Sequence, residues 1–447
     1  MTRDTLADKR RPGLAAGLKQ RLIQDALQRK LKNAGRQPAA AQGRDVPEQH
    51  YRFALHPGYQ QLQIISEGAA RLGVGSPFFK LHEGGAGAST RIAGASYLNF
   101  ASYNYLGLSG DPAVNEAAKR AVDRYGTSVS ASRLVSGERP IHRELEEALA
   151  ALYGVDAAVT FVSGHATNVS TLGLLFGPKD LIVHDELIHN SVLQGIQLSG
   201  AKRLPSPHND PEALDALLQT HRRDFERVLV VLEGLYSMDG DYPDLPRYVE
   251  IKRRHRVFLM VDEAHSLGVM GRHGHGIREH YGLAGDDVDI WMGTLSKTLA
   301  GCGGYIAGET ALVEHLKFLA PGFLYSVGMP PPVAAACLAA LRRMRDLPER
   351  VAALQARGAS FLARARHAGI DTGTSAGLAI VPAIVGHSLR AARLSAALFA
   401  RGINAQPILY PAVPEQSARL RFFLCSEHSE ADIAYTVDAL AEEVERL

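Results

Sequence analysis

Short apolar runs alternate with longer amphipathic stretches through the middle of the chain. The apolar runs are Ala157–Phe161, Leu181–His184, Arg227–Glu233, Val257–Asp262 and Val288–Gly293. Helical patterns separate most of them, at Glu144–Tyr153, Asn168–Leu175, Pro211–Leu218 and Leu245–Arg254. Continuous apolar strands joined by helices are typical of a mainly parallel sheet covered on both faces. The pattern therefore predicts an α/β fold, in which ligands bind beyond the carboxyl ends of the strands.

Different patterns flank this α/β region. Leucines at helical spacing from Leu14 to Leu31 predict a basic amphipathic helix over about residues 13–33, and Asn33–Val46 is expected to be a linker. Beyond about Pro330, the helical patterns Val333–Leu347 and Glu349–His367 precede a short α+β pattern. We therefore expect an arm with its linker (1–50), an N-terminal segment (51–110), a large domain (111–332) and a small C-terminal domain (333–447).

Composition and charge narrow the function classes. The 447 residues are 46% hydrophobic and 21% charged, as in an ordinary globular protein. The net charge of +2 hides an asymmetry: residues 1–36 carry +7, which leaves −5 for the rest. Nucleic acid is therefore not an expected partner, and no apolar run approaches the roughly eighteen residues of a membrane span. Cys302, Cys337 and Cys425 fit neither a zinc site nor a disulfide framework, so we expect a cytoplasmic location.

Candidate chemistry lies at the ends of the apolar runs. Within Trp291–Gly304 a strand leads into a Gly-Thr-Leu-Ser-Lys turn, so Lys297 is expected where a lysine of depressed pKa forms Schiff bases. From this segment alone, a surface-loop lysine is the alternative. Within Val261–Gly268, Asp262 ends another run, where a carboxylate keeps a pyridinium nitrogen protonated, and His265 reaches the same pocket. A metal site or a capped turn is the alternative, although no cysteine or paired histidine completes a metal shell.

Two further segments also follow apolar runs. Ser163–Gly164 opens a helix after a strand, where backbone N–H groups bind phosphate, although an ordinary N-cap explains it equally well. His184–Gln194 contains His189, whose imidazole we interpret as stacking on an aromatic cofactor. A solvated histidine at a helix start is the alternative, and a metal site is disfavoured because the spacing is not that of zinc-binding helices.

The remaining segments are weak individually. Glu233–Asp241 follows a buried run and by itself indicates turn chemistry. In Ala418–Phe422, Arg421 presents a planar fork suited to a carboxylate, or else a salt bridge on an edge strand. Phosphate cradle, stacking histidine, ring-nitrogen acid, lysine and carboxylate-binding arginine follow one another in this order, each at or near a strand. Together they predict a site for pyridoxal 5'-phosphate (PLP) and no metal site.

The motifs resemble those of the α-oxoamine synthases, a family of fold-type I PLP-dependent enzymes. The resemblance covers roughly Phe78 to Leu447 and rests on SYNYLGL (Ser102–Leu108), YGTSVSASRLVSG (Tyr125–Gly137), LEGLYSMDGD (Leu232–Asp241), VDEAHSLG and GTLSKT. It implies a large domain with a mainly parallel sheet of the seven-stranded type and a smaller C-terminal α+β domain. It also implies PLP as cofactor and a homodimer with shared active sites.

The resemblance assigns a role to each matching residue. Lys297 is the Schiff-base lysine and general acid/base, Asp262 pairs with the pyridine nitrogen, and His265 pairs with the phenolic oxygen. His189 stacks on the ring and helps to place the amino acid. Backbone N–H groups of Gly164 and His165 and the hydroxyl of Thr294 are implied to bind the phosphate, and the hydroxyl of Ser326 to reach the phosphate in the neighbouring subunit. Ser237 is implied to lie beside the cofactor. Arg421 is implied to hold the substrate carboxylate, with Asn104 nearby.

The implied reaction is a decarboxylative Claisen-type condensation of a small L-amino acid (serine, glycine or alanine) with an acyl thioester, giving an α-aminoketone. The segments SYNYLGLSG, GCGGYIAG and QPILYPAVPE look most like synthases of polyketide or prodiginine-type assembly lines, which take the acyl group from an acyl carrier protein rather than coenzyme A. Ala300 replaces a common Gly, Gly328 replaces a common Ser, and Tyr410–Val413 differs from a Pro-Pro-Thr type of segment. These departures concern substrate choice more than reaction type.

Three other functions compete with this hypothesis. An aminotransferase on the same scaffold would need a keto acid as second substrate. A non-catalytic partner subunit would typically lack the lysine, and Lys297 is present. Nucleic-acid binding has only the basic arm in its favour. That arm is either a solvated helix lying on the dimer or a docking element for an acidic carrier protein.

Overall fold

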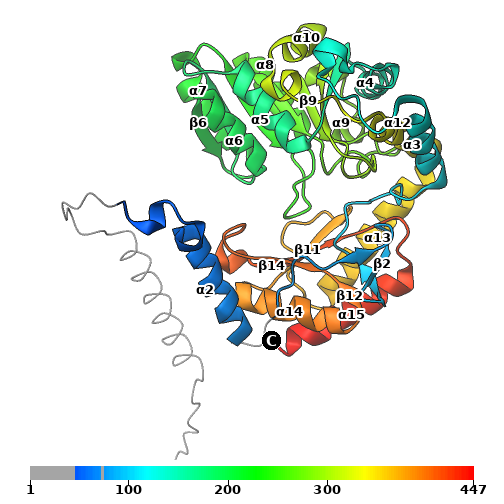
Figure 1. The fold of residues 1–447 in the computed structure, drawn as a ribbon. Coiled ribbons are helices and arrows are strands. Elements are labelled where there is room, and N and C mark those ends of the chain that lie inside the picture. The colour runs from blue at the N-terminus through cyan, green and yellow to red at the C-terminus, as the bar shows by residue number, and fades with distance from the viewer. Residues whose placement is uncertain (1–45, 72–74) are drawn as a thin grey trace, which may run out of the picture. The chain divides into compact units, whose positions relative to one another are not determined.

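The computed structural model describes residues 46–71 and 75–447. The helix predicted at 13–33 and nearly all of the predicted linker lie outside the described residues. The chain divides into two compact units, which meet between Ser76 and Pro77. In the first unit, the described elements are η1 (Glu48–His50), η2 (Phe53–Leu55) and α2 (Pro57–Arg71) (Figure 1). The predicted domain boundaries remain a prediction.

The second unit contains a seven-stranded mixed sheet in the order β4-β10-β9-β8-β7-β5-β6. Its strands are β4 (Ala157–Phe161), β5 (Leu181–Asp185), β6 (Lys202–Ser206), β7 (Val228–Glu233), β8 (Phe258–Asp262), β9 (Ile290–Thr294) and β10 (Gly304–Gly308). β5 to β9 pair in parallel, whereas β10 is antiparallel to both β4 and β9. The predicted α/β class and mainly parallel sheet are thus confirmed.

Apolar side chains cover both faces of this sheet. In β7, Val230 and Leu232 belong to one core, whereas Leu229 and Val231 belong to the other. The first core also takes residues from α4 (Pro140–Tyr153), α7 (Pro211–His221) and α8 (Leu245–His255), and the second from α5 (Gly164–Leu175), α6 (Asn190–Ser199) and α10 (Thr310–Leu319). Because both faces are buried, these strands read as unbroken apolar runs.

Two smaller sheets complete the second unit, and the first of them joins strands from its start to a strand near its end. β1 (His82–Glu83), β2 (Ser89–Ile92), β3 (Ala95–Asn99) and β12 (Ile403–Asn404) form one, in which β3 and β12 are parallel. β11 (Ile380–Ile384), β14 (Arg419–Phe423) and β13 (Gln406–Ile408) form the other. The pairing of β3 with β12 places the segment after residue 99 beside the C-terminal strands.

The remaining helices complete the second unit. They are α3 (Pro112–Tyr125), η3 (Arg133–Gly137), η4 (Arg222–Asp224), α9 (Ile277–Tyr281), η5 (Gly285–Asp287), α11 (Pro321–Leu324), α12 (Pro331–Asp346), α13 (Pro348–His367), α14 (Ser388–Ala400), η6 (Glu415–Ser417) and α15 (Glu430–Glu445). Asp111 caps α3 by accepting from Ala113 N, and Ser429 caps α15 by accepting from Asp432 N. Among the described residues, no helix has the length and apolar character to span a membrane.

Candidate active site

A cavity of about 220 Å³ lies beyond the carboxyl ends of β4, β5, β7, β8 and β9. This is the edge at which doubly wound sheets bind their ligands. Its lining brings together residues from five separate strand ends and the segments that follow them: Ser163, Gly164, His165, Asn168, His189, Ser191, Glu233, Asp262, Ala264, His265, Met292, Thr294, Ser296 and Lys297.

Lys297 follows β9 in a loop that folds back on itself. Leu295 N donates to Gly303 O at 2.9 Å, and Gly301 N donates to Leu295 O at 2.9 Å. Burial lowers the pKa of Lys297 to about 8, an effect that Arg421 reinforces and that Asp262 and Glu233 oppose. An amine of this pKa is partly unprotonated near neutral pH, as a Schiff-base lysine requires.

Asp262 and His265 face the same cavity from the end of β8. Asp262 accepts two hydrogen bonds, from Ala264 N at 3.0 Å and from Asn168 Nδ2 at 3.1 Å. His265 Nδ1 is 2.7 Å from the hydroxyl of Tyr105. Burial, together with the positive charge of Lys297, holds the pKa of His265 well below its usual range, so the ring is neutral.

The start of α5 provides the predicted phosphate cradle. The first N–H groups of a helix lack intrahelical partners. Ser163 Oγ accepts from Ala166 N, which leaves the N–H groups of Gly164 and His165 at the helix start. A Cβ on Gly164 would lie 3.1 Å from Thr294 Oγ1, so Thr294 closes one side of the cradle. A Cβ on Gly304 would lie 2.7 Å from Gly164 Cα, which explains glycine in β10.

Arg421 approaches from the central strand of the three-stranded sheet. Its Nη1 donates to Ser237 O at 2.8 Å, and its guanidinium carbon lies 4.5 Å from the centre of the Phe423 ring. Its Nε is buried without a partner among the described residues. Burial lowers the pKa of Arg421 from its ordinary value. A buried guanidinium with an unused donor is suited to a carboxylate.

Besides Arg421, three predicted residues are absent from the lining of this cavity. Ser237 contributes backbone groups: its N–H donates to Glu233 Oε2 at 3.2 Å and its carbonyl accepts from Arg421. Asn104 binds neighbouring backbone, donating to Ala86 O at 2.7 Å and accepting from Ser109 N at 3.0 Å. Ser326 lies between α11 and α12.

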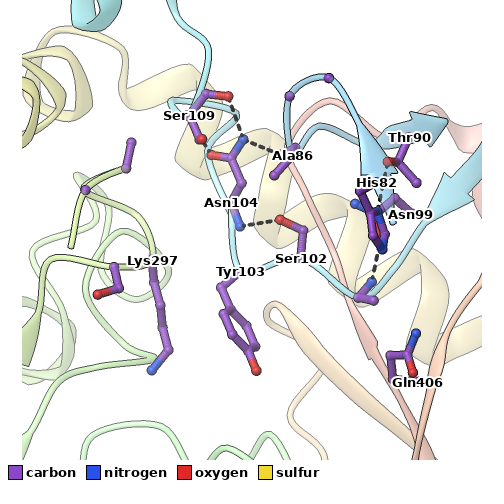
Figure 2. Close-up of a pocket in the computed structure, with 16 residues that line it drawn as sticks. His82, Ala86, Thr90, Asn99, Ser102, Tyr103, Asn104, Ser109, Lys297 and Gln406 are labelled. Carbon is purple, nitrogen blue, oxygen red and sulfur yellow. Dashed lines mark hydrogen bonds between the residues drawn. The ribbon is translucent and has the colours of Figure 1, made fainter. Parts of the chain in front are cut away.

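Asn104 does line a second cavity, of about 410 Å³, which shares Ser296 and Lys297 with the first. Figure 2 shows Lys297 across this space from Tyr103, with His82, Asn99 and Gln406 further along the wall. The side chain of Lys297 is therefore accessible from two adjoining cavities.

Sequence reasoning missed three residues of the first cavity. Glu233 ends β7 beside Asp262, which ends β8, so its position at a strand end was an available signal. Burial, with repulsion from Asp262, raises the pKa of Glu233 to about 8. Asn168 and Ser191 lie on α5 and α6, 23 residues apart, yet share a hydrogen bond of 2.9 Å. No local pattern predicts such a contact between helices.

The residues present fit PLP. The lysine has a lowered pKa, the carboxylate expected at the ring nitrogen accepts two hydrogen bonds, and a helix start offers N–H groups without intrahelical partners. Oδ1 of Asn168 and Oε1 of Glu233 are buried without partners among the described residues, and both side chains line the cavity. Sheet topology and site together define a fold-type I PLP-dependent enzyme.

Comparison with known proteins agrees with this class. The sequence profile of the family "Aminotransferase class I and II" matches residues 95–440. The 8-amino-7-oxononanoate synthase of Geobacter sulfurreducens is 42% identical over 80% of this chain and 91% of its own length. The enzyme of the same name from Fervidobacterium nodosum is 40% identical over 79% and 89%. The chain belongs to the aminotransferase class I and II family, and within it to the α-oxoamine synthases.

Solved structures agree. Serine palmitoyltransferase from Sphingomonas wittichii superposes with a TM-score of 0.83 at 29% identity, over 88% of this chain and 98% of that one. A structure of SPT (serine palmitoyltransferase) with the PLP internal aldimine also gives a TM-score of 0.83, at 28% identity over 87% of this chain and 98% of that one. The 8-amino-7-oxononanoate synthase of Francisella tularensis gives 0.68 at 25% identity over 78% and 98%. The chain is therefore a PLP-dependent enzyme of the acyltransferase type.

Proposed function

We propose that the enzyme condenses a small L-amino acid with an acyl thioester, releasing carbon dioxide and the thiol and leaving an α-aminoketone. The observation that supports this most directly is the convergence of Lys297, Asp262, His265 and His189 on one cavity, with the buried guanidinium of Arg421 close enough to lower the pKa of Lys297. When bound, PLP supplies an electron-withdrawing ring that stabilises negative charge on the α-carbon of the amino acid.

In this proposal, Arg421 orients the substrate. Its free Nε and the second edge of its guanidinium hold the amino acid carboxylate, while Ser237 O and the Phe423 ring hold the guanidinium itself. Orientation of the α-carbon bonds supplies on the order of 7 kcal/mol in well-aligned cases. When PLP is bound, His189 would stack on its ring, and the backbone N–H groups of Gly164 and His165, with the hydroxyl of Thr294, would hold its phosphate.

Lys297 moves the proton. Its amine takes the α-proton of the bound amino acid, and its ammonium returns a proton to the same carbon after carbon dioxide has left. A pKa of about 8 suits both directions near neutral pH, and such acid–base catalysis contributes about 10²–10⁴ in rate. Asp262 would keep the ring nitrogen of bound PLP protonated, and the neutral imidazole of His265 would provide a hydrogen bond to its phenolic oxygen.

Alanine is the amino acid to test first. The name of these relatives, 8-amino-7-oxononanoate synthase, describes a product whose amine-bearing carbon carries one methyl group. Alanine provides that methyl group, whereas glycine and serine would leave a hydrogen or a hydroxymethyl. We retain glycine and serine as competing substrates.

For the acyl donor we propose a thioester that enters through the second cavity, which meets the first at Lys297. Carriage on an acyl carrier protein, in polyketide-type or lipid-like biosynthesis, follows from the resemblance of SYNYLGLSG, GCGGYIAG and QPILYPAVPE and from the basic arm. Coenzyme A is the alternative carrier. Three unpaired cysteines support a cytoplasmic setting.

We further propose a homodimer in which Ser326 of one subunit completes the site of the other. Ser326 is flanked by Tyr325 and Val327, whose exposed fractions are 87% and 51%, and the nearby Phe318 is exposed by 63%. Clustered exposed apolar side chains of this kind mark interaction surfaces. A partner copy on this surface would bring the Ser326 hydroxyl to a phosphate. Sedimentation of the purified protein at two concentrations tests this.

The experiment for the reaction combines each amino acid with one acyl chain presented on coenzyme A and on a carrier protein. Stoichiometric release of thiol and of ¹⁴C-carbon dioxide from carboxyl-labelled alanine, with a new α-aminoketone by mass spectrometry, is the expected result. An aminotransferase would instead convert alanine to pyruvate in the presence of a keto acid and would release no carbon dioxide. Lys297→Ala, folded and able to bind PLP non-covalently, should abolish both activities.

A further inference from the structure

A chain of hydrogen bonds joins Asp262 to His189 through two residues that no motif identified. The Nδ2 atom of Asn168 is 3.1 Å from Asp262 Oδ2 and 2.9 Å from Ser191 Oγ. Ser191 Oγ is in turn 2.7 Å from Nδ1 of His189, and Ser191 N is 3.3 Å from the same atom. Asn168 and Ser191 are each only 1% exposed.

Close packing of α5 and α6 makes this chain possible. A Cβ on Gly195, one turn beyond Ser191, would lie 2.8 Å from Asn168 O and 2.9 Å from Leu172 Cβ. Glycine at this position lets the two helices approach until their polar side chains meet. The pair therefore sits in a fixed position behind the cavity.

The direction of each hydrogen bond follows from donor chemistry. Asp262 is acceptor-only when charged, so the amide of Asn168 must turn its NH₂ toward it. The second N–H of the same group points to Ser191 Oγ, which leaves the hydroxyl proton of Ser191 free to donate onward to His189 Nδ1. The backbone N–H of Ser191 also points at Nδ1. Because Nδ1 accepts both, the neutral ring of His189 carries its proton on Nε2.

The charges around His189 also favour the neutral ring. Burial is the largest cause lowering the pKa of His189, and positive charge on Lys297, His165 and Arg421 acts in the same direction; Asp262 opposes them. These four groups lie in the segment after β9, on α5, in β14 and in β8.

We propose that Asn168 and Ser191 are positioning residues that hold the proton of His189 on Nε2 and couple this ring to charged Asp262. Asn168 acts on both ends at once, since one NH₂ group contacts the carboxylate and the hydroxyl. His189 then presents an N–H donor, rather than a lone pair, to whatever occupies the cavity. That His189 directs this N–H toward the amino acid rests on the proposed function, whereas the tautomer itself does not.

The test reads the tautomer directly. The full-length protein is labelled with ¹⁵N-histidine, and the His189 signals are assigned by their loss in His189→Asn. In the wild type, with and without PLP, we expect nitrogen shifts of an Nε2–H ring at neutral pH. Ser191→Ala should raise the fraction of Nδ1–H ring and raise the pKa of His189 by about half to one unit, because the neutral ring loses an accepted hydrogen bond. Asn168→Ala should raise the Nδ1–H fraction and the pKa of His189 as well, but by less than Ser191→Ala.

Matched variants separate this role from general packing. Ser170→Ala removes a buried hydroxyl on α5, which accepts a hydrogen bond from Gly322 N at 3.1 Å, and should leave the His189 signals unchanged. Ser191→Thr keeps the hydroxyl and should show the wild-type nitrogen shifts. Across the series of variants, the acid limb of the pH profile of kcat/KM should shift as the fraction of the Nδ1–H ring rises. Unchanged nitrogen shifts in Ser191→Ala, or an Nδ1–H ring in the wild type, would overturn the proposal even if the condensation reaction proves correct.

Discussion

At the scale of single residues, the lowered pKa of Lys297 is open to direct measurement. The unprotonated amine attacks an aldehyde, so the rate at which the apoenzyme attaches PLP should rise with pH and reach half its maximum near pH 8, where burial places the pKa. An ordinary lysine would give a midpoint near 10.5. Borohydride trapping followed by peptide mass spectrometry measures the attached fraction at Lys297. A midpoint above 10 would contradict this account of the site.

Glu233 gives a second prediction at this scale. Burial raises its pKa to about 8 from an ordinary 4.5, so the native state keeps a proton that the unfolded chain has already lost. The native state is therefore progressively destabilised as pH rises from 4.5 to 8. Glu233→Gln removes this penalty and should stabilise the apoenzyme at pH 8 by a few kcal/mol, with little difference at pH 4.5.

Denaturant unfolding across this pH range measures the effect of Glu233→Gln, and Glu146 supplies the contrast. Glu146 is also buried, but its ion pair with Arg133 lowers its pKa below the ordinary value. Glu146→Gln should therefore destabilise the protein at neutral pH. Equal loss of stability in both variants would show that Glu233 is charged in the native state.

At the scale of elements, the loop after β9 carries the departure from family pattern at Ala300. Its φ of +56° lies in the left-handed region, which costs an alanine about 1 kcal/mol or more relative to glycine. Glycine loses more entropy on folding, so Ala300→Gly should raise stability by less than about 1 kcal/mol. Ala93, exposed with a φ of +49°, is the matched control.

Both variants are compared by thermal unfolding of the apoenzyme. Ala300 also lines the second cavity, so only its variant should change the KM of the acyl donor. A gain in Ala93→Gly with a loss in Ala300→Gly would mean that packing of the Ala300 methyl group against the core outweighs backbone strain.

The contrast between strands shows what sequence patterns can predict. The five apolar runs became β4, β5, β7, β8 and β9, because burial on both faces demands unbroken apolar residues. The apolar pattern did not identify β6, on which Lys202 and Arg203 are exposed, or β10, where the close approach to Gly164 requires glycine. Site residues at strand ends were predictable for the same topological reason. Asn168 and Ser191 were not, since their contact depends on how two helices pack.

At the scale of the whole molecule, the site draws on distant parts of the second unit. The segment after β3 supplies Tyr105, which contacts His265, and β14 supplies Arg421, which contacts Ser237 in the loop after β7. In the proposed function Arg421 holds the amino acid carboxylate, so the position of β14 would set the geometry of the bound substrate. Changes that loosen β14 should raise the KM of the amino acid before they affect binding of the cofactor.

The charge asymmetry of the chain leads to the last prediction. Residues 1–36 carry +7, whereas the rest carries −5. If the arm docks an acidic carrier protein, deleting residues 1–36 should raise the KM of a carrier-bound donor several-fold at low salt and leave the coenzyme A donor unaffected. High salt should shrink the difference, because it screens exposed charges over about 10 Å. A second variant, with the arm's basic residues changed to glutamine, keeps the length and should behave like the deletion. Identical kinetics with the carrier-bound donor at low salt would overturn the docking role of the arm.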